Sequence, residues 1–221
     1  MQNLREETKL VFFRHGETKS NVEGFMQGIS NKNTELTIKG IEQSKELGDK
    51  LFNKYGSMNY VLSSGKNRIT ATLDIISKRS NFIIGSIIEI DNLKGIVMGD
   101  LTGRPFSEFI SFLQSVDADF VRAEDLANRD NMLRYINTQY PNGDSRGGGC
   151  LRVVEELILF YEKNKDSLEM ETIGVCIHSS TLCIIKGLLG LRPLIDNSEF
   201  FEIRISDLYS MRTQLNELII R

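Results

Sequence analysis

The stretch KLVFFRHGETKSN, from Lys9 to Asn21, decides the fold of this chain. It opens with Lys9–Phe13, an apolar run rich in β-forming residues, which predicts a buried strand. The run stops at Arg14 and His15, so the strand delivers two basic side chains to one edge of a sheet. Open α/β sheets build their ligand sites at the edge where the strands end. The stretch therefore predicts an α/β fold with a polar site after its first strand.

Strand-like and helix-like segments alternate along most of the chain. The predicted strands are Lys9–Phe13, Asn59–Ser63, Ile83–Ile90 and Thr172–Ile177, and the predicted helices are Thr37–Tyr55, Asn67–Lys78, Leu151–Lys163 and Ser180–Leu189. The stretch that begins at Phe200 predicts a final edge strand. This alternation favours a three-layer α/β/α sandwich with a mostly parallel central sheet.

The alternation breaks between Leu93 and Gly149, where glycines, a proline and two short helical patterns follow one another. Long excursions of this kind in compact domains are usually functional. We therefore expect one domain over residues 1–221 with an inserted cap at about residues 93–149. The run Gly147–Gly149 would weaken a helix start, so it predicts either a flexible loop or a loop that makes room for a bulky ligand.

The overall composition excludes several classes of function. The chain has 221 residues and a net charge of −3, and no basic stripe, which argues against nucleic acid as a partner. No run of residues has the length of a membrane span, and the first residues do not resemble a signal peptide. Cys150, Cys176 and Cys183 show no CxxC spacing, and there are only two histidines, so we expect no metal site and a reduced, cytoplasmic protein.

Both histidines follow predicted strands: His15 comes after the first and His178 after the run TIGVCI. Arg68 opens the helix that follows another strand, NYVLS. If these strands are neighbours, Arg14, His15, Arg68 and His178 converge at one sheet edge. Guanidinium groups bind phosphoryl oxygens in a bidentate manner, so this cluster would suit a phosphoryl group.

Five ordered blocks between Lys9 and about Leu191 resemble one known family. They are RHGETKSN with the MQG turn at 14–28, LTIKGIEQS at 36–44, SSGKNRITATL at 63–73, PNGDSRGGGCLR at 141–152 and VCIHSSTLCIIKGLLG at 175–190. RHG alone is a weak signal, but five blocks in order are a strong one. The chain resembles the histidine phosphatase superfamily, in its phosphoglycerate mutase-like branch.

The resemblance implies a role for each matched residue. His15 would be the nucleophile that forms a phosphohistidine, and Arg14, Arg68 and His178 would bind the phosphoryl oxygens. The implied substrate contacts are Asn21, Gln27, Gly28 and Ser179. The implied partner is a small phosphorylated or anionic molecule, with no metal or other cofactor, and a homodimer is left open.

One position departs from the family pattern. The family supplies a glutamate early in the cap, which protonates the leaving oxygen. When Gly99 and Gly103 are aligned with the family glycines, that acid falls on Gly95 of the stretch LKGIVMGDLTG. Asp91, Asp100 or Asp144 could substitute for it, and we prefer Asp100.

Three hypotheses follow from the sequence. The first is a phosphatase of a small phosphorylated metabolite or activated phosphate that acts through phospho-His15. The second is a binding module that holds a phosphate or carboxylate ligand without turning it over, and the third is an enzyme of another reaction class that reuses the anion pocket. The intact nucleophile favours the first, whereas Gly95 favours the other two. A mutase is less favoured because it would need the acid.

Overall fold

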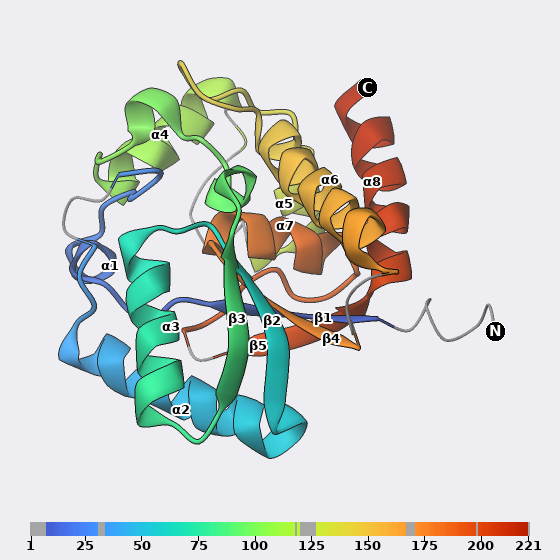
Figure 1. Ribbon diagram of the computed structural model, residues 1–221. Helices are drawn as coiled ribbons and strands as arrows, with labels where there is room; N and C mark the ends of the chain where they lie inside the picture. The colour runs from blue at the N-terminus through green and yellow to red at the C-terminus, as the bar shows by residue number, and fades with distance from the viewer. Residues whose placement is uncertain are drawn as a thin grey trace.

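The computed structural model describes residues 8–30, 34–117, 119, 127–166, 171–197 and 199–220 (Figure 1). Its strands are β1 (Lys9–Arg14), β2 (Ser57–Ser63), β3 (Ile83–Glu89), β4 (Thr172–Ile177) and β5 (Phe200–Arg204). Its α-helices are α1 (Lys19–Glu23), α2 (Ile38–Tyr55), α3 (Asn67–Arg79), α4 (Phe106–Val116), α5 (Arg129–Arg134), α6 (Arg146–Asn164), α7 (Ser179–Leu188) and α8 (Ile205–Ile220). Two short 3₁₀ helices, η2 (Asp91–Lys94) and η3 (Gly99–Leu101), follow β3.

The five strands form one sheet in the order β3-β2-β4-β1-β5. The pairs β2–β3, β2–β4 and β1–β4 are parallel, and only β5 joins antiparallel, at an edge. The last residues of β1 and β4, Arg14 and Ile177, are direct partners in this register. His15 and His178 therefore leave the sheet side by side, and the predicted mostly parallel α/β sheet is confirmed.

Each face of the sheet has its own hydrophobic core. Successive side chains of a strand point to opposite faces. Accordingly Val11 and Phe13 of β1 pack with α2 and α3, whereas Leu10 and Phe12 pack in a second cluster with α6, α7 and α8. Figure 1 shows α2 and α3 on one side of the strands and α6, α7 and α8 on the other. The result is the expected three-layer α/β/α arrangement.

The chain after Phe200 differs from expectation. The predicted edge strand is present as β5, but it ends at Arg204 and continues directly into α8, which the sequence reading missed. The buried residues of α8 are Ile205, Leu208, Met211 and Leu215, at three-to-four-residue spacing. This helical period begins within the stretch read as a strand, which is why the two were not separated.

Helix α6 begins at Arg146, earlier than predicted, and includes the glycine run. Ser145 caps its first turn by accepting a hydrogen bond from Gly148 N. The glycines permit close packing, because a Cβ on Gly149 would lie 3.0 Å from the Cα of Ile96. Neither expected loop is present: the run is a closely packed helical turn.

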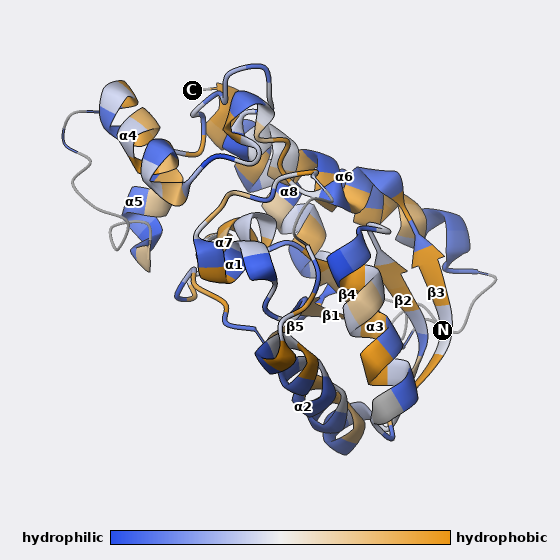
Figure 2. Ribbon diagram, turned by 90° about the vertical axis from the view of Figure 1, so that its left-hand side faces the viewer, coloured by the Kyte–Doolittle hydropathy of each residue, from blue (hydrophilic) through white to orange (hydrophobic). Residues whose placement is uncertain are grey.

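The segment between β3 and α6 contains η2, η3, α4 and α5. Figure 2 shows α4 and α5 at the end of the molecule away from β2 and β3. The segment between β3 and α6 is joined to the residues that follow α1 by backbone hydrogen bonds: Met26 N donates to Arg104 O, and Phe106 N donates to Gly24 O. Across the described ranges, no helix is both long enough and apolar enough to cross a membrane.

Candidate active site

Two helices hold the loop that carries His15. Gly16 N donates to Thr72 Oγ1 of α3 at 3.0 Å, and Glu17 N donates to Gln43 Oε1 of α2 at 2.9 Å. Gly40 of α2 packs directly against Glu17, so that a Cβ there would lie 2.9 Å from the Glu17 backbone N and C. The LTIKGIEQS and SSGKNRITATL blocks therefore serve to fix the position of the His15 loop.

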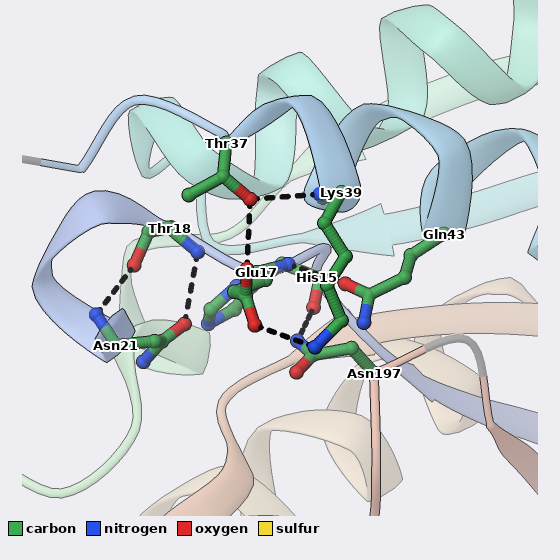
Figure 3. Close-up of polar contacts among 9 residues, drawn as sticks. His15, Glu17, Thr18, Asn21, Thr37, Lys39, Gln43 and Asn197 are labelled. Atoms are coloured by element: carbon green, nitrogen blue, oxygen red, sulfur yellow. Dashed lines mark hydrogen bonds and ion pairs between the residues drawn. The ribbon is translucent and has the colours of Figure 1, made fainter.

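Polar side chains extend this support, as Figure 3 shows. Thr37 Oγ1 donates to Glu17 Oε1 at 2.9 Å, and Lys39 Nζ pairs with Glu17 Oε2 at 3.1 Å. Desolvation opposes ionisation of Glu17, but the bonds from Lys39 and Thr37 outweigh it and lower the carboxyl pKa. Asn197 Nδ2 donates to His15 O at 2.5 Å from the far side. The peptide group between His15 and Gly16 is thus held at both its oxygen and its nitrogen, and the next peptide group is held at Glu17 N.

The His15 imidazole is held in one tautomer. Its Nδ1 lies 2.8 Å from Gly16 O, and a carbonyl oxygen only accepts, so Nδ1 carries the proton and Nε2 keeps its lone pair. Burial holds the pKa of His15 well below its ordinary value, and the charges of Arg68 and Arg14 add to this effect. A neutral imidazole with a free Nε2 is the form required of a nucleophile.

His178 adopts the opposite tautomer. Its Nδ1 lies 3.0 Å from Arg68 Nη2, which can only donate, so Nδ1 is the acceptor. The proton is then on Nε2, which donates to Ser64 Oγ at 3.1 Å. Burial lowers the pKa of His178 strongly, with Arg68 the next cause. The two rings meet edge to face, with centroids 6.1 Å apart, so both histidines belong to one site.

Arg14 and Arg68 flank the histidines. Arg14 Nη1 donates to Ile195 O at 3.0 Å, and Arg68 Nη2 also donates to Gly28 O at 2.9 Å. In each guanidinium the buried Nε has no hydrogen-bond partner in the described structure. Burial lowers the pKa of Arg68 to about 10, so both groups remain cationic at neutral pH. The site thus holds two positive charges next to a neutral imidazole.

These groups open into a cavity of about 490 Å³. The predicted substrate contacts all line it: Asn21, Gln27, Gly28 and Ser179. Asn21 Oδ1 accepts from Thr18 N in the capping box of α1, which Figure 3 shows. Among the described residues, no aspartate or glutamate lines the cavity. An anion that enters it would meet cations and neutral donors.

The three aspartates that the sequence suggested as general acids lie elsewhere. Asp100 is exposed and accepts a hydrogen bond from Asn142 Nδ2 at 3.0 Å. Asp91 is exposed and pairs with Lys94 at 2.9 Å. Asp144 Oδ2 accepts hydrogen bonds from Val97 N and from Arg152 Nη2. This carboxylate therefore holds the loop before η3 in place. The structure brings none of the three to the cavity.

Gly95 nevertheless lies at the site. Its φ of 81° is one that side-chain-bearing residues rarely adopt, and a Cβ there would lie 3.0 Å from His178 Cδ2. Its carbonyl accepts a hydrogen bond from Arg152 Nη2. The position that the resemblance assigns to the acid is therefore next to the histidines but offers only backbone.

Five polar residues of the cavity were not singled out as site residues from the sequence: Lys94, Tyr140, Arg146, Ser180 and Cys183. Arg146 stands in the quoted block PNGDSRGGGCLR, immediately after the helix cap Ser145. The sequence offered no signal for this residue, because the helix was predicted to begin only at Leu151 and the glycine run before it was interpreted as a loop. No cluster of three or more potential metal ligands occurs in the described part of the chain.

Comparison with known proteins identifies relatives of this arrangement. The family model described as histidine phosphatase superfamily (branch 1) matches residues 10–193, and no curated protein matches the sequence significantly. Among solved structures, a protein from Escherichia coli K-12 assigned as an α-ribazole-5′-P phosphatase shares 23% identity, with a TM-score of 0.63 and coverage of 90% of both chains. The mycobacterial glucosyl-3-phosphoglycerate phosphatase in complex with VO3 shares 21% over 88% of this chain and 92% of that one, with a TM-score of 0.61. Bacillus stearothermophilus YhfR shares 21% over 88% and 90%, with a TM-score of 0.63. At these identities the structural matches show a common fold.

Proposed function

Because the chain belongs to branch 1 of the histidine phosphatase superfamily, we propose that it is a phosphatase of a small phosphorylated molecule that acts through a phosphohistidine on His15. One observation carries the proposal. The Nδ1 proton of His15 is bound to Gly16 O, which leaves the Nε2 lone pair free in a cavity flanked by Arg14 and Arg68. That combination of neutral nucleophile and paired cations suits attack on phosphorus.

The reaction would proceed in two transfers. His15 Nε2 attacks the phosphorus atom, and the bond to the leaving oxygen breaks as the new N–P bond forms. Arg14 and Arg68 stabilise the charge on the equatorial oxygens, which is where a phosphoryl transition state gathers it. Water then attacks the phosphohistidine, which releases phosphate and restores neutral His15. No step requires a metal ion.

The cavity should restrict which leaving groups the enzyme can release. General acid catalysis contributes about 10²–10⁴-fold, and no carboxylic acid lines the described cavity. Tyr140 also lines it, but burial raises the pKa of this phenol and so weakens it as an acid. We therefore propose that Gly95 takes the place of the usual glutamate and that the substrate carries a leaving group that departs without a proton, such as a phenolate or a carboxylate.

Turnover of p-nitrophenyl phosphate tests the proposal, because nitrophenolate departs without protonation. The wild-type chain should release nitrophenolate, and His15→Ala should release none. Trapping with labelled phosphate donor in acid-free conditions should place the label on His15, and His178→Ala should still acquire it at a reduced rate. Label on His178, or equal turnover by His15→Ala, would contradict the mechanism.

A leaving-group series tests the finer claim. Turnover should fall steeply from nitrophenyl to phenyl to alkyl phosphates, since each step raises the pKa of the departing group without an acid to compensate. A flat series would mean that a proton donor operates in the site.

The absence of a carboxylate from the described lining also favours a second candidate, a module that binds phosphorylated ligands without turnover. It predicts that the wild-type chain binds a phosphonate analogue but hydrolyses no phosphate ester, including p-nitrophenyl phosphate.

A further inference from the structure

Arg146 is a buried cation that the proposed phosphoryl transfer does not use. It is the first residue of α6, it lines the cavity, and only 7% of the residue is exposed. Its Nη1 is buried without a hydrogen-bond partner, and its guanidinium forms no hydrogen bond or ion pair with any other described residue. The other arginines of the cavity, Arg14 and Arg68, each donate to a backbone carbonyl.

This placement is costly for the folded protein. A buried charge without a partner loses its hydration and gains nothing in return. A cation in the first turn of a helix is also repelled by the helix dipole. The backbone amides of this turn offer no compensation to an anion, because Arg146 N, Gly147 N and Gly148 N donate to Thr138 O, Ile136 O and Ser145 Oγ. The guanidinium, and not the helix terminus, thus has a hydrogen-bond donor at this place without a partner among the described residues.

The titratable neighbours of Arg146 do not neutralise it. Tyr140 and Cys183 both line the cavity, and both sense the charge of Arg146. Burial raises the pKa of the Tyr140 phenol and of the Cys183 thiol, so both are uncharged at neutral pH. The positive charge of Arg146 therefore lacks an internal counterion in the described structure.

Five apolar side chains of one segment also line the cavity, together with Lys94 of the same segment. The cavity lining includes Ile96, Met98, Phe106, Phe109 and Met132, all of which come from the segment between β3 and α6. Phe109 and Met132 are almost completely buried, whereas Phe106 is 39% exposed. A ligand that reaches this part of the cavity would lay an apolar body against these side chains.

We propose that Arg146 binds a second anionic group of the substrate, a carboxylate, at the end of an apolar body that carries the phosphoryl group. The inference rests on the proposed function for its phosphoryl end. A single guanidinium without a partner matches one planar, singly charged oxyanion, which it can bind through two parallel hydrogen bonds. The substrate class is then a phosphate ester or acyl phosphate with an apolar middle and a distal carboxylate.

Aryl phosphates with a carboxylate on the ring test this assignment. The carboxylate is attached directly or through one or two methylene groups, and each compound is paired with its primary amide, which has the same shape without the charge. For at least one arm length, wild-type kcat/KM should favour the carboxylate by about 10- to 100-fold, the range of a charge-assisted hydrogen bond.

The variants locate the origin of the preference. Arg146→Gln should reduce the ratio of carboxylate to amide to about one, and Arg146→Lys should leave an intermediate ratio because the charge remains but the fork is lost. Lys163→Gln removes one charge from an exposed position of the same helix and should preserve the wild-type ratio. An equal loss in Lys163→Gln would assign the effect to overall charge and overturn the proposal.

A binding measurement separates this inference from the proposed function. Benzylphosphonates with the same carboxylate and amide arms cannot be hydrolysed, so calorimetry reads their affinities whether or not the chain is an enzyme. If the carboxylates bind more tightly than the amides, the difference depends on Arg146, and p-nitrophenyl phosphate is not turned over, the proposed phosphatase activity is contradicted and the second anion site is supported. Turnover through His15 with no carboxylate preference at any arm length, in rate or in affinity, would overturn the Arg146 site alone.

Discussion

The contact between Gly40 and Glu17 makes a sharp prediction about how the His15 loop is held. A methyl group on Gly40 would sit well inside 3.0 Å of the Glu17 carbonyl oxygen and 2.9 Å from its carbonyl carbon. Ordinary contact begins at 3.4 Å, so the loop must retreat from α2 by 0.5 Å at the carbon and by more at the oxygen. Glu17 lies two residues after His15, and its peptide cannot retreat without moving the imidazole.

The expected result of Gly40→Ala is a loss of activity out of proportion to the loss of stability. Alanine gains about 1 kcal/mol of helix propensity over glycine, and overpacking costs about 1–3 kcal/mol, so the free energy of unfolding should fall by no more than about 2 kcal/mol. Misplacement of a reacting group by about 1 Å can cost about 10²-fold. We expect kcat for p-nitrophenyl phosphate to fall by about 10- to 100-fold.

Gly48→Ala is the matched control for this experiment. It lies in the same helix, and the change to alanine gains the same helix propensity. The added Cβ would lie 2.7 Å from the Cβ of Ser80 and would therefore contact that side chain instead of the His15 loop. Urea denaturation should show similar destabilisation of both variants, while initial rates of nitrophenolate release should fall only in Gly40→Ala. Equal kcat in the two folded variants would refute the reasoning that α2 positions the nucleophile.

Two further predictions concern the histidines and Gly95. Burial lowers the pKa of His15 and of His178 and keeps both neutral in the folded state, whereas in the unfolded chain they take up protons below about pH 6.5. The free energy of unfolding should therefore fall by up to about 1.4 kcal/mol per histidine for each pH unit below that value. Urea denaturation at pH 7.5 and 5.5 measures this, and a free energy of unfolding that does not decline would contradict it. Gly95→Glu and Gly95→Gln should both lower turnover of p-nitrophenyl phosphate, because a side chain at a φ of 81° is strained and crowds His178; initial rates measure this, and wild-type turnover by either variant would contradict it.

The sequence predicted the sheet because its signals are local. A β-branched and aromatic run that ends in a basic pair marks β1, and strand-helix alternation marks the layers. The order of the strands was not predicted, and only the structure shows that β1 pairs with β4, which brings His15 beside His178. The missed helix α8 shows the limit of such signals. Strand β5 ends at Arg204 and the helix begins at the next residue, Ile205, so no turn separates them.

The cavity could be predicted only in part, for a physical reason. His15, Arg68 and His178 each follow a strand, and the ends of parallel strands meet at one edge wherever the strands pair. Arg146 belongs to a helix whose start depends on how closely glycines let the loop at Ile96 approach. That packing depends on tertiary contacts, which the sequence does not show. The sequence alone therefore predicted a loop at the glycine run.

The two ends of the cavity constrain the ligand jointly. A substrate whose leaving oxygen needs a proton would find no carboxylic acid among the described lining residues, and a substrate without a distal negative charge would leave Arg146 buried and unpaired. A single molecule meets both conditions if its leaving group is a stable anion and its far end is a carboxylate. Such a ligand suits an electropositive cavity in a chain whose net charge is −3, because the local field of the site, and not the charge of the whole molecule, then selects it. We therefore propose that the glycine at position 95 and the guanidinium of Arg146, which has no partner among the described residues, both suit one activated substrate with two anionic groups.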